Sequence, residues 1–178
     1  MLARKISPVG LLKLLLLDLD ETLLPTQVLR SARHGQAVCD LTQVAGYRAV
    51  APYPGLPAVL TELAHRVPLA LVSSSPRWYV DQLLRAHLSF VPFEVIVTYD
   101  DVTAIKPDPE PLLLALARTQ VESHEALYVG DDLVDYGASA FAGIAFLGAG
   151  WAQHTSLPTA SIRLPSPTAL LNYVPRRS

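Results

Sequence analysis

The sequence predicts an α/β fold: a doubly wound parallel sheet with helices on both faces and a small helical insertion after the first strand. Short uninterrupted apolar runs recur along the chain, and such runs are typical of strands buried on both faces. Amphipathic segments at helical spacing alternate with these runs, which is the order that produces a parallel sheet. The chain of 178 residues is 51% hydrophobic and 17% charged, so it can bury a core of one domain.

Six apolar runs are expected to be strands. The first, Leu14–Leu17, stops abruptly at Asp18, and the second stops at Ser73. In chain order the expected strands are residues 14–17, 68–72, 93–97, 126–129, 144–147 and 161–164.

Five segments are expected to be core helices. Leu56 to His65 repeats apolar residues at helical spacing, and Pro57 is tolerated in the first turn. Gly143 is expected to end one helix as its C-cap, and Ser166 to cap the start of the last. In chain order the expected helices are residues 56–65, 76–88, 112–119, 136–142 and 167–173.

The insertion segment (residues 25–54) has a different character. Basic and aromatic residues stand among scattered apolar ones, and Leu29, Ala32, Gln36 and Val38 give only a weak helical pattern. We therefore expect one or two short helices here, closed by the turn signal at residues 52–55. The whole chain, residues 1–178, is expected to be a single domain.

The composition excludes several classes of function. A net charge of −2 and a pI near 6.2 give no reason to expect a nucleic-acid partner or a membrane surface. The single cysteine, Cys39, cannot form an internal disulfide, which fits a cytoplasmic protein. Arg4 and Lys5 precede an apolar stretch, as in a signal peptide, but Lys13 interrupts that stretch and no cleavage site follows. The apolar stretch is too short to cross a bilayer, so we expect a core strand at its end.

Asp18 and Asp20 stand at the end of the first expected strand. Because side chains alternate along a strand, both carboxylates would point to the same side. They repel each other there, so the pair needs a divalent cation or a shared proton. For the pair alone, a ligand site and an ordinary acidic turn are equally good interpretations.

Polar side chains also follow three further expected strands. Ser73 and Ser74 follow the second, Lys106 lies in the loop after the third, and Asp131 follows the fourth. Parallel strands end along one edge of a sheet, so these groups can meet Asp18. Carboxylates suit Mg²⁺, a serine hydroxyl can donate to a phosphate, and a lysine offsets phosphoryl charge. Asp135, just beyond, could hold the lysine or metal-bound water.

Each of these elements taken alone has a structural interpretation. Ser73 could cap a helix, Lys106 could belong to a solvated turn, and Asp131 to an ordinary strand-to-helix turn. Tyr99-Asp100-Asp101 is also ambiguous, and a structural role is the better interpretation there. The specific signal is the order, because each polar element ends its own strand.

Four motifs thus stand in sequence along the chain. Asp18-Leu19-Asp20-Glu21-Thr22 has the form DxDx[TV], and Ser73 ends an apolar strand. Lys106-Pro107 follows, and then Gly130 to Asp135 in the form GDxxxD. Together they resemble the haloacid dehalogenase superfamily, specifically the phosphatase branch that includes phosphoglycolate phosphatase-like proteins. The resemblance covers essentially the whole chain and implies a Rossmann-like core with a reduced helical cap at residues 25–54.

The resemblance implies a magnesium-dependent phosphomonoesterase acting on a small phosphorylated metabolite. Asp18 would attack phosphorus to form an aspartyl-phosphate, and Asp20 would be the general acid and base. The presence of Asp20 argues against carbon–halogen cleavage. Magnesium would be held by Asp18, the carbonyl of Asp20, and Asp131. The other implied roles are phosphate binding or loop positioning by Thr22, Ser73, Ser74 and Lys106, and support of the ligands by Asp132 and Asp135.

The short insertion segment leaves the substrate unspecified. A reduced cap leaves the site more open, so we expect a broad or large substrate, or a cap completed by another subunit. Either a monomer or a homodimer is compatible with this. A phosphotransferase of the same superfamily and a non-enzymatic phospho-accepting signalling domain are the alternative functions. Candidates for contact with the leaving group are Arg30, Arg33, His34, Tyr47 and Arg48.

Overall fold

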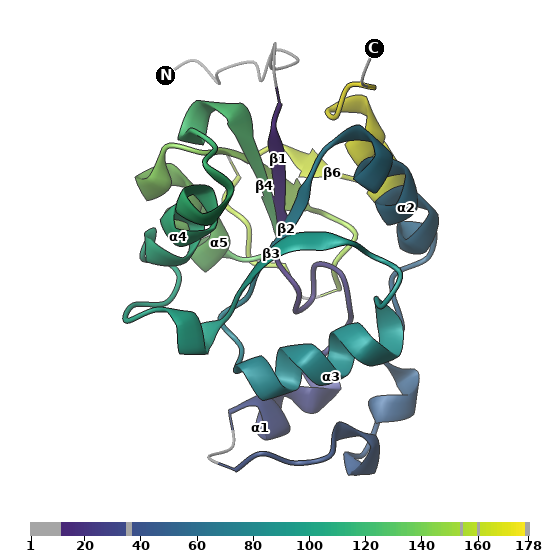
Figure 1. The fold of residues 1–178 in the computed structure, drawn as a ribbon. Coiled ribbons are helices and arrows are strands. Elements are labelled where there is room, and N and C mark those ends of the chain that lie inside the picture. The colour runs from purple at the N-terminus through teal and green to yellow at the C-terminus, as the bar shows by residue number, and fades with distance from the viewer. Residues whose placement is uncertain (1–11, 35–36, 154, 160, 177–178) are drawn as a thin grey trace.

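A computed structural model describes residues 12–34, 37–153, 155–159 and 161–176. Its sheet has six parallel strands in the order β3-β2-β1-β4-β5-β6 (Figure 1). The strands are β1 (Leu14–Leu17), β2 (Leu69–Val72), β3 (Phe93–Val97), β4 (Ala126–Gly130), β5 (Ala145–Ala149) and β6 (Arg163–Leu164). The six expected strands are confirmed, with bounds that differ by at most two residues.

The central strand β1 is buried along its whole length. Leu15 and Leu17 pack into the hydrophobic cluster on one face of the sheet, and Leu14 and Leu16 pack into the cluster on the other. A strand covered on both faces needs no polar alternation, which explains the uninterrupted leucine run.

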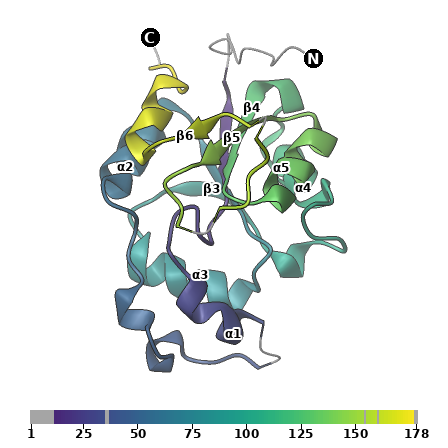
Figure 2. The same ribbon diagram turned by 180° about the vertical axis from the view of Figure 1, so that it is seen from behind.

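Helices cover both faces of the sheet (Figures 1 and 2). On one face, α2 (Leu56–Arg66) and α3 (Arg77–His87) bury their apolar sides with Leu15 and Leu17. On the other, α4 (Glu110–Thr119) and α5 (Leu133–Ala142) close the second cluster. The predicted doubly wound architecture is therefore confirmed.

Helix α5 begins at Leu133 rather than at the expected Tyr136. The Asp132 side chain accepts the N–H of Leu133, and the Asp135 side chain accepts the N–H of Asp132. This reciprocal capping box starts the helix earlier than the apolar pattern indicates. At the other end Gly143 adopts φ +70°, the left-handed conformation expected of a C-cap.

Helix α4 and the last helical segment also differ from expectation in detail. Helix α4 begins at Glu110, two residues before Leu112, because Pro111 is well suited to the first turn. The last helical segment, η6 (Pro167–Asn172), is a 3-10 helix that packs against α2. Ser166 occupies the N-cap position as predicted, but its hydroxyl lies 2.8 Å from the Thr168 hydroxyl and accepts no backbone N–H.

The insertion segment follows β1 and lies beside α3 (Figure 1). Gln82 on α3 accepts the N–H of Leu41 at 3.0 Å and donates to the carbonyl of Cys39 at 2.8 Å, which ties the segment to the core. The expected helical position at Gln36 lies outside the described residues. The described helical pieces are η1 (Gln27–Leu29), α1 (Arg30–Arg33), η2 (Leu41–Gln43) and η3 (Tyr47–Ala49).

Of the segment considered as a signal peptide (residues 1–17), residues 1–11 lie outside the described part of the chain, and its end forms β1, the expected core strand. Among the residues that the structure describes, no helix has the length and apolar character needed to cross a membrane.

Candidate active site

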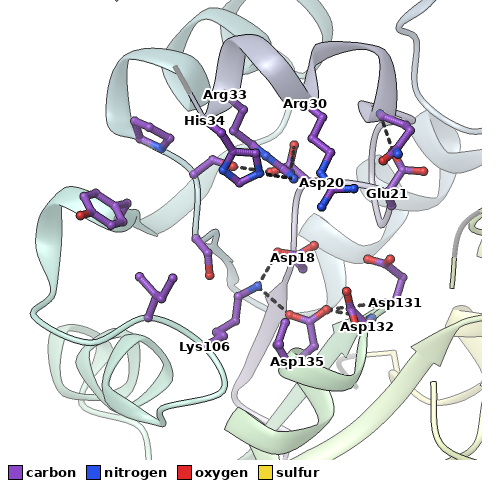
Figure 3. Close-up of a pocket in the computed structure, with 17 residues that line it drawn as sticks. Asp18, Asp20, Glu21, Arg30, Arg33, His34, Lys106, Asp131, Asp132 and Asp135 are labelled. Atoms are coloured by element: carbon purple, nitrogen blue, oxygen red, sulfur yellow. Dashed lines mark hydrogen bonds and ion pairs between the residues drawn. The ribbon is translucent and has the colours of Figure 1, made fainter. Parts of the chain in front are cut away.

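The polar residues that follow β1 and β4 meet at the centre of the sheet. These strands are hydrogen-bonded neighbours, and the N–H of Asp18 donates to the carbonyl of Val129 at 2.9 Å. The strand order reverses between them, which is the point where open α/β sheets form their ligand crevice. A cavity of about 750 Å³ opens here (Figure 3). The predicted site residues that line it are Asp18, Asp20, Ser74, Lys106, Asp131, Asp132 and Asp135.

Lys106 occupies the floor of this cavity. Its ammonium donates to Asp18 Oδ1 and to Asp135 Oδ1, both at 2.6 Å, and to the Tyr128 hydroxyl at 2.9 Å. Burial alone would lower the pKa of Lys106, but the carboxylates of Asp135 and Asp18 outweigh it and raise that pKa well above its ordinary value. The lysine therefore keeps its charge in a buried site.

Asp135 is a support for its neighbours. Its Oδ1 accepts from Lys106 and from the Tyr128 hydroxyl at 2.8 Å, and its Oδ2 accepts the backbone N–H groups of Asp131 and Asp132. These four bonds use most of the acceptor capacity of one carboxylate. Gly130 makes the arrangement possible, because a Cβ atom there would lie 2.6 Å from side-chain atoms of Asp135.

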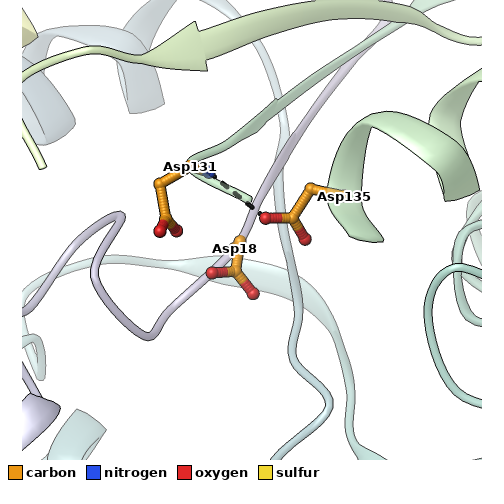
Figure 4. A group of neighbouring side chains, drawn as sticks. All are labelled: Asp18, Asp131 and Asp135. Atoms are coloured by element: carbon orange, nitrogen blue, oxygen red, sulfur yellow. Dashed lines mark hydrogen bonds between the residues drawn. The ribbon is translucent and has the colours of Figure 1, made fainter. Parts of the chain in front are cut away.

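Three carboxylates could hold a metal ion at this floor. Asp18, Asp131 and Asp135 each offer an oxygen within 4.8 Å of the others (Figure 4). Burial is the main cause that raises the pKa of Asp18 to about 7 and that of Asp131 to about 8; repulsion from neighbouring carboxylates adds to this effect, and Lys106 partly offsets it. A divalent cation would relieve this repulsion, and oxygen ligands are those that Mg²⁺ prefers, so the donor set fits the expected ion. Asp135 joins this cluster, although the sequence placed it in a supporting role.

The carboxylate of Asp20 belongs to a separate hydrogen-bond network. Its Oδ1 accepts from the hydroxyls of Thr26 at 2.7 Å and Tyr79 at 2.8 Å. Its Oδ2 accepts from Ser75 at 2.6 Å and, more weakly, from Ser73 at 3.4 Å. These contacts engage the carboxylate away from the carboxylate cluster at the floor, so Asp20 would reach a metal there through its backbone carbonyl, as the resemblance implies.

The predicted phosphate ligands occupy different places. Ser73 is buried and bonded to Asp20 and to the N–H of Ser75 at 3.1 Å. The Ser74 hydroxyl is buried in the cavity wall and has no hydrogen-bond partner among the described residues. Thr22 lies beneath the cavity, where its hydroxyl donates to Asp131 Oδ1 at 2.7 Å. Of the three hydroxyls, that of Ser74 is the one left open to a ligand.

The insertion segment supplies one wall of the cavity. Arg30, Arg33 and His34 line it, whereas Tyr47 and Arg48 are not among the lining residues. Three of the five expected leaving-group contacts therefore line the cavity, and two do not.

The acidic cluster at residues 99–101 is structural, as expected. Asp101 accepts the N–H and hydroxyl of Thr98, both at 2.8 Å, and pairs with Arg77 at 2.6 Å and Arg118 at 3.1 Å. Burial acts to raise the pKa of Asp101, but these donors outweigh it and lower that pKa to about 2. Of the three residues, Tyr99 alone lines the cavity.

Sequence reasoning missed several residues that shape the site. Ser75 was visible in the serine run after β2, but nothing in the sequence shows that Ser75 rather than Ser73 makes the short bond to Asp20. Tyr79 and Tyr128 fall within an expected helix and an expected strand, and such a pattern does not show where a phenol hydroxyl points. Trp151, whose indole N–H donates to the Thr22 carbonyl at 3.0 Å, comes from a loop with no motif.

The strand order and the site together define an α/β protein with a crevice suited to a phosphate and a divalent cation. The chain belongs to the haloacid dehalogenase-like hydrolase family, because residues 36–149 match the sequence profile of that family. The family inferred from the motifs is therefore confirmed.

Curated relatives agree with this membership. The chain is 35% identical over 125 residues to validoxylamine A 7'-phosphate phosphatase of Streptomyces hygroscopicus subsp. limoneus, covering 64% of this chain and 57% of that protein. It is 38% identical over 85 residues to phosphoglycolate phosphatase of Escherichia coli K12, covering 48% of this chain and 34% of that protein. The match thus spans about half or less of these curated relatives.

Two solved structures share the fold. A haloacid dehalogenase phosphatase from Thermococcus onnurineus has a TM-score of 0.70 at 22% identity, covering 90% of this chain and 96% of that one. CbbY from Rhodobacter sphaeroides in complex with phosphate has a TM-score of 0.65 at 20% identity, covering 90% of this chain and 96% of that one.

Proposed function

We propose that this chain is a magnesium-dependent phosphomonoesterase that hydrolyses a small phosphorylated metabolite through an aspartyl-phosphate. The main observation in support is the buried floor of the cavity, where the ammonium of Lys106 lies 2.6 Å from Asp18 with Asp131 beside them. A carboxylate next to a fixed cation and a metal-binding set is what phosphoryl transfer needs, because its catalysis depends on positioning and charge neutralisation.

In the first step, an oxygen of Asp18 attacks phosphorus and the bond from phosphorus to the ester oxygen breaks. Asp20 donates a proton to that leaving oxygen. Lys106 offsets the charge that shifts onto the phosphoryl oxygens, and the open Ser74 hydroxyl donates to one of them. The two carboxylates therefore have different tasks, which matches their separate hydrogen-bond networks.

In the second step, a water molecule attacks phosphorus of the aspartyl-phosphate and gives its proton to Asp20. The bond between phosphorus and Asp18 breaks, which releases inorganic phosphate and restores the Asp18 carboxylate and the protonated form of Asp20. Mg²⁺ bound by Asp18, Asp131 and the carbonyl of Asp20 would neutralise the crowded carboxylates and the phosphate. Asp135 would hold Lys106 and the Asp131 backbone in place, and Asp132 would hold the start of α5.

Three further features complete the proposal. The insertion segment (residues 25–54) acts as a reduced cap, because it forms a wall of the cavity. The chain works as one domain, as a monomer or a homodimer. The names of the curated relatives, phosphatases of phosphorylated small molecules, support a substrate of the same general class.

The test is release of phosphate from nitrophenyl phosphate with Mg²⁺ or with a chelator. We expect activity with Mg²⁺, loss of it with the chelator, and loss of it in Asp18→Asn. Asp81→Asn is the matched control, because Asp81 is an exposed residue of α3. Full activity of Asp18→Asn would refute the assignment of the nucleophile.

Assays of phosphoryl transfer on the same protein distinguish the proposed function from its two alternatives. A phosphotransferase would move the phosphoryl group to an added alcohol or sugar phosphate faster than to water. A phospho-accepting signalling domain would keep the phosphate on Asp18 for many minutes after treatment with acetyl phosphate. A phosphomonoesterase turns over repeatedly and releases phosphate to water.

A further inference from the structure

The cavity has charges of opposite sign on two of its walls. Its floor holds the acidic cluster around Lys106, whereas the wall formed by α1 presents Arg30 and Arg33, with His34 directly after that helix (Figure 3). Lys106 and the proposed metal already provide for the phosphoryl group at the floor. The basic wall faces the part of the cavity beyond it, where the rest of the substrate must lie.

Arg33 is the best-placed residue of this wall. Its guanidinium lies 3.1 Å from Asp20 Oδ1 and its Nη2 lies 3.4 Å from His34 Nε2. Its Nε is buried and has no hydrogen-bond partner among the described residues. The side chain as a whole is 22% exposed, but a buried N–H donor without an acceptor is costly unless a ligand supplies one.

Arg30, a neighbour of Arg33, adds a second positive charge to this wall. Arg30 lines the cavity and makes no ion pair within the described part of the chain. His34 lines the cavity as well, next to Arg33. Two arginines of one short helix therefore face a cavity whose acidic side chains lie mostly at the opposite end.

The position of Arg33 also limits where its ligand lies. Asp20 is the residue proposed to protonate the leaving oxygen, and Arg33 touches Asp20. The guanidinium therefore lies close to the position that the ester oxygen of a bound substrate would occupy. A group that Arg33 binds must be attached close to that oxygen.

We propose that Arg33, with Arg30 beside it, selects phosphate esters whose leaving group carries a second anion, a carboxylate or a phosphate, within a few bonds of the ester oxygen. Arginine forms paired hydrogen bonds with both kinds of anion, so either one satisfies its open donor. This proposal rests on the proposed phosphomonoesterase function and names its substrate class.

The test compares three esters with closely related skeletons. Glycerol 3-phosphate has a neutral leaving group, 3-phosphoglycerate has a carboxylate in place of its terminal alcohol, and glycerol 1,3-bisphosphate adds a phosphate. We expect wild-type kcat/KM to be at least about tenfold higher for one of the anionic esters, the effect of one charge-assisted hydrogen bond. The ester that benefits shows which anion the wall accepts.

Arg33→Gln is expected to lower kcat/KM for the preferred anionic ester by about tenfold or more and to change that for glycerol 3-phosphate much less. Arg33→Lys keeps the positive charge but lacks the planar guanidinium that binds an anion through two N–H groups. It should therefore retain part of the preference for the anionic ester that Arg33→Gln loses. Arg48→Gln is the matched control, because Arg48 is an exposed arginine of the same segment that does not line the cavity.

Two results would overturn the proposal. One is an equal wild-type kcat/KM for all three esters. The other is an equal loss for all three esters in Arg33→Gln, which would make Arg33 a positioning residue for Asp20. A calorimetric titration of the esters into Asp18→Asn gives a second readout that needs no turnover. Absence of nitrophenyl phosphatase activity would refute the proposed function, whereas equal affinity for the three esters in this titration would refute the selection by Arg33.

Discussion

The ammonium of Lys106 lies 2.6 Å from Oδ1 of Asp18, and both side chains are more than nine-tenths buried. Together with the second contact to Asp135, this makes Lys106 the charge that keeps two buried carboxylates in one site. Removing one member of such a cluster leaves uncompensated charge in a poorly solvated place.

Lys106→Met should therefore affect both stability and activity. We expect a loss of about 3–5 kcal/mol in the free energy of unfolding, because two buried carboxylates lose their counter-charge. We also expect kcat to fall by about 10²–10³-fold, since a fixed charge on the phosphoryl group is lost. Urea unfolding and steady-state kinetics measure the two effects.

Lys13→Met is the matched control for stability. Lys13 pairs with Glu125 at the same distance, 2.6 Å, but its side chain is 47% exposed. An exposed pair contributes about 1 kcal/mol or less. Equal losses for Lys13→Met and Lys106→Met would show that the buried cluster is not a special source of stability.

Asp20→Asn should separate the two chemical steps. Nitrophenolate leaves without a proton, so the first step should still proceed and give a burst of nitrophenol. The second step needs a base for water, so steady-state turnover should fall by about 10²–10⁴-fold. With an alkyl phosphate, whose leaving oxygen needs a proton, no burst should form. Rapid-mixing kinetics with the two esters test this, and an alkyl burst as large as the nitrophenyl one would contradict the acid role of Asp20.

Gly130→Ala should damage the site through a steric contact. The added Cβ would lie 2.6 Å from side-chain atoms of Asp135, so Asp135 must move and lose its bonds to Lys106 and the Asp131 backbone. We expect a loss of about 1–3 kcal/mol in unfolding free energy, as for other overpacked positions, together with a large loss of activity.

Gly55→Ala provides the contrast. A Cβ at Gly55 would meet nothing within 4 Å, but the residue has φ +81°, which costs other residues roughly 1–2 kcal/mol. This variant should lose stability and keep its kcat. If Gly130→Ala also kept its kcat, the close packing of Gly130 against Asp135 would have no part in catalysis.

The sequence was informative where one periodic pattern or one motif determined the outcome. The apolar run Leu14–Leu17 favoured a strand buried on both faces, and the order of polar strand ends indicated that Asp18, Lys106 and Asp131 could meet. The direction of each side chain was beyond that reasoning, because it depends on loop geometry. Thr22, for example, does not line the cavity, and its hydroxyl donates to Asp131 instead.

The insertion segment was the least predictable part for a related reason. Its helices are three or four residues long, so they leave almost no periodic signal. Arg33 and Arg48 are the same residue type in the same segment. Leu29 and Leu41 pack into the core and anchor the segment, and in the resulting arrangement Arg33 lines the cavity whereas Arg48 does not.

Mg²⁺ should stabilise the protein more as the pH rises. In the metal-free protein, burial and mutual repulsion raise the pKa of Asp18 to about 7 and that of Asp131 to about 8, above the ordinary value of 3.8. The folded state then holds these protons more tightly than the unfolded state. The stability that this provides is complete below about pH 4 and is lost as the pH rises through about 7 to 8.

Thermal unfolding of the metal-free protein at several pH values should therefore show Tm falling between pH 4 and pH 8. Mg²⁺ competes with these protons and neutralises the same carboxylates, so its stabilising effect should be small at acidic pH and largest near pH 8. At a hundred times its Kd, Mg²⁺ would add about 2.7 kcal/mol. Asp131→Asn should flatten the fall in Tm and remove most of the Mg²⁺ effect, whereas Asp81→Asn should leave both unchanged. An Asp131→Asn protein that Mg²⁺ stabilised as strongly as wild type would place the ion elsewhere.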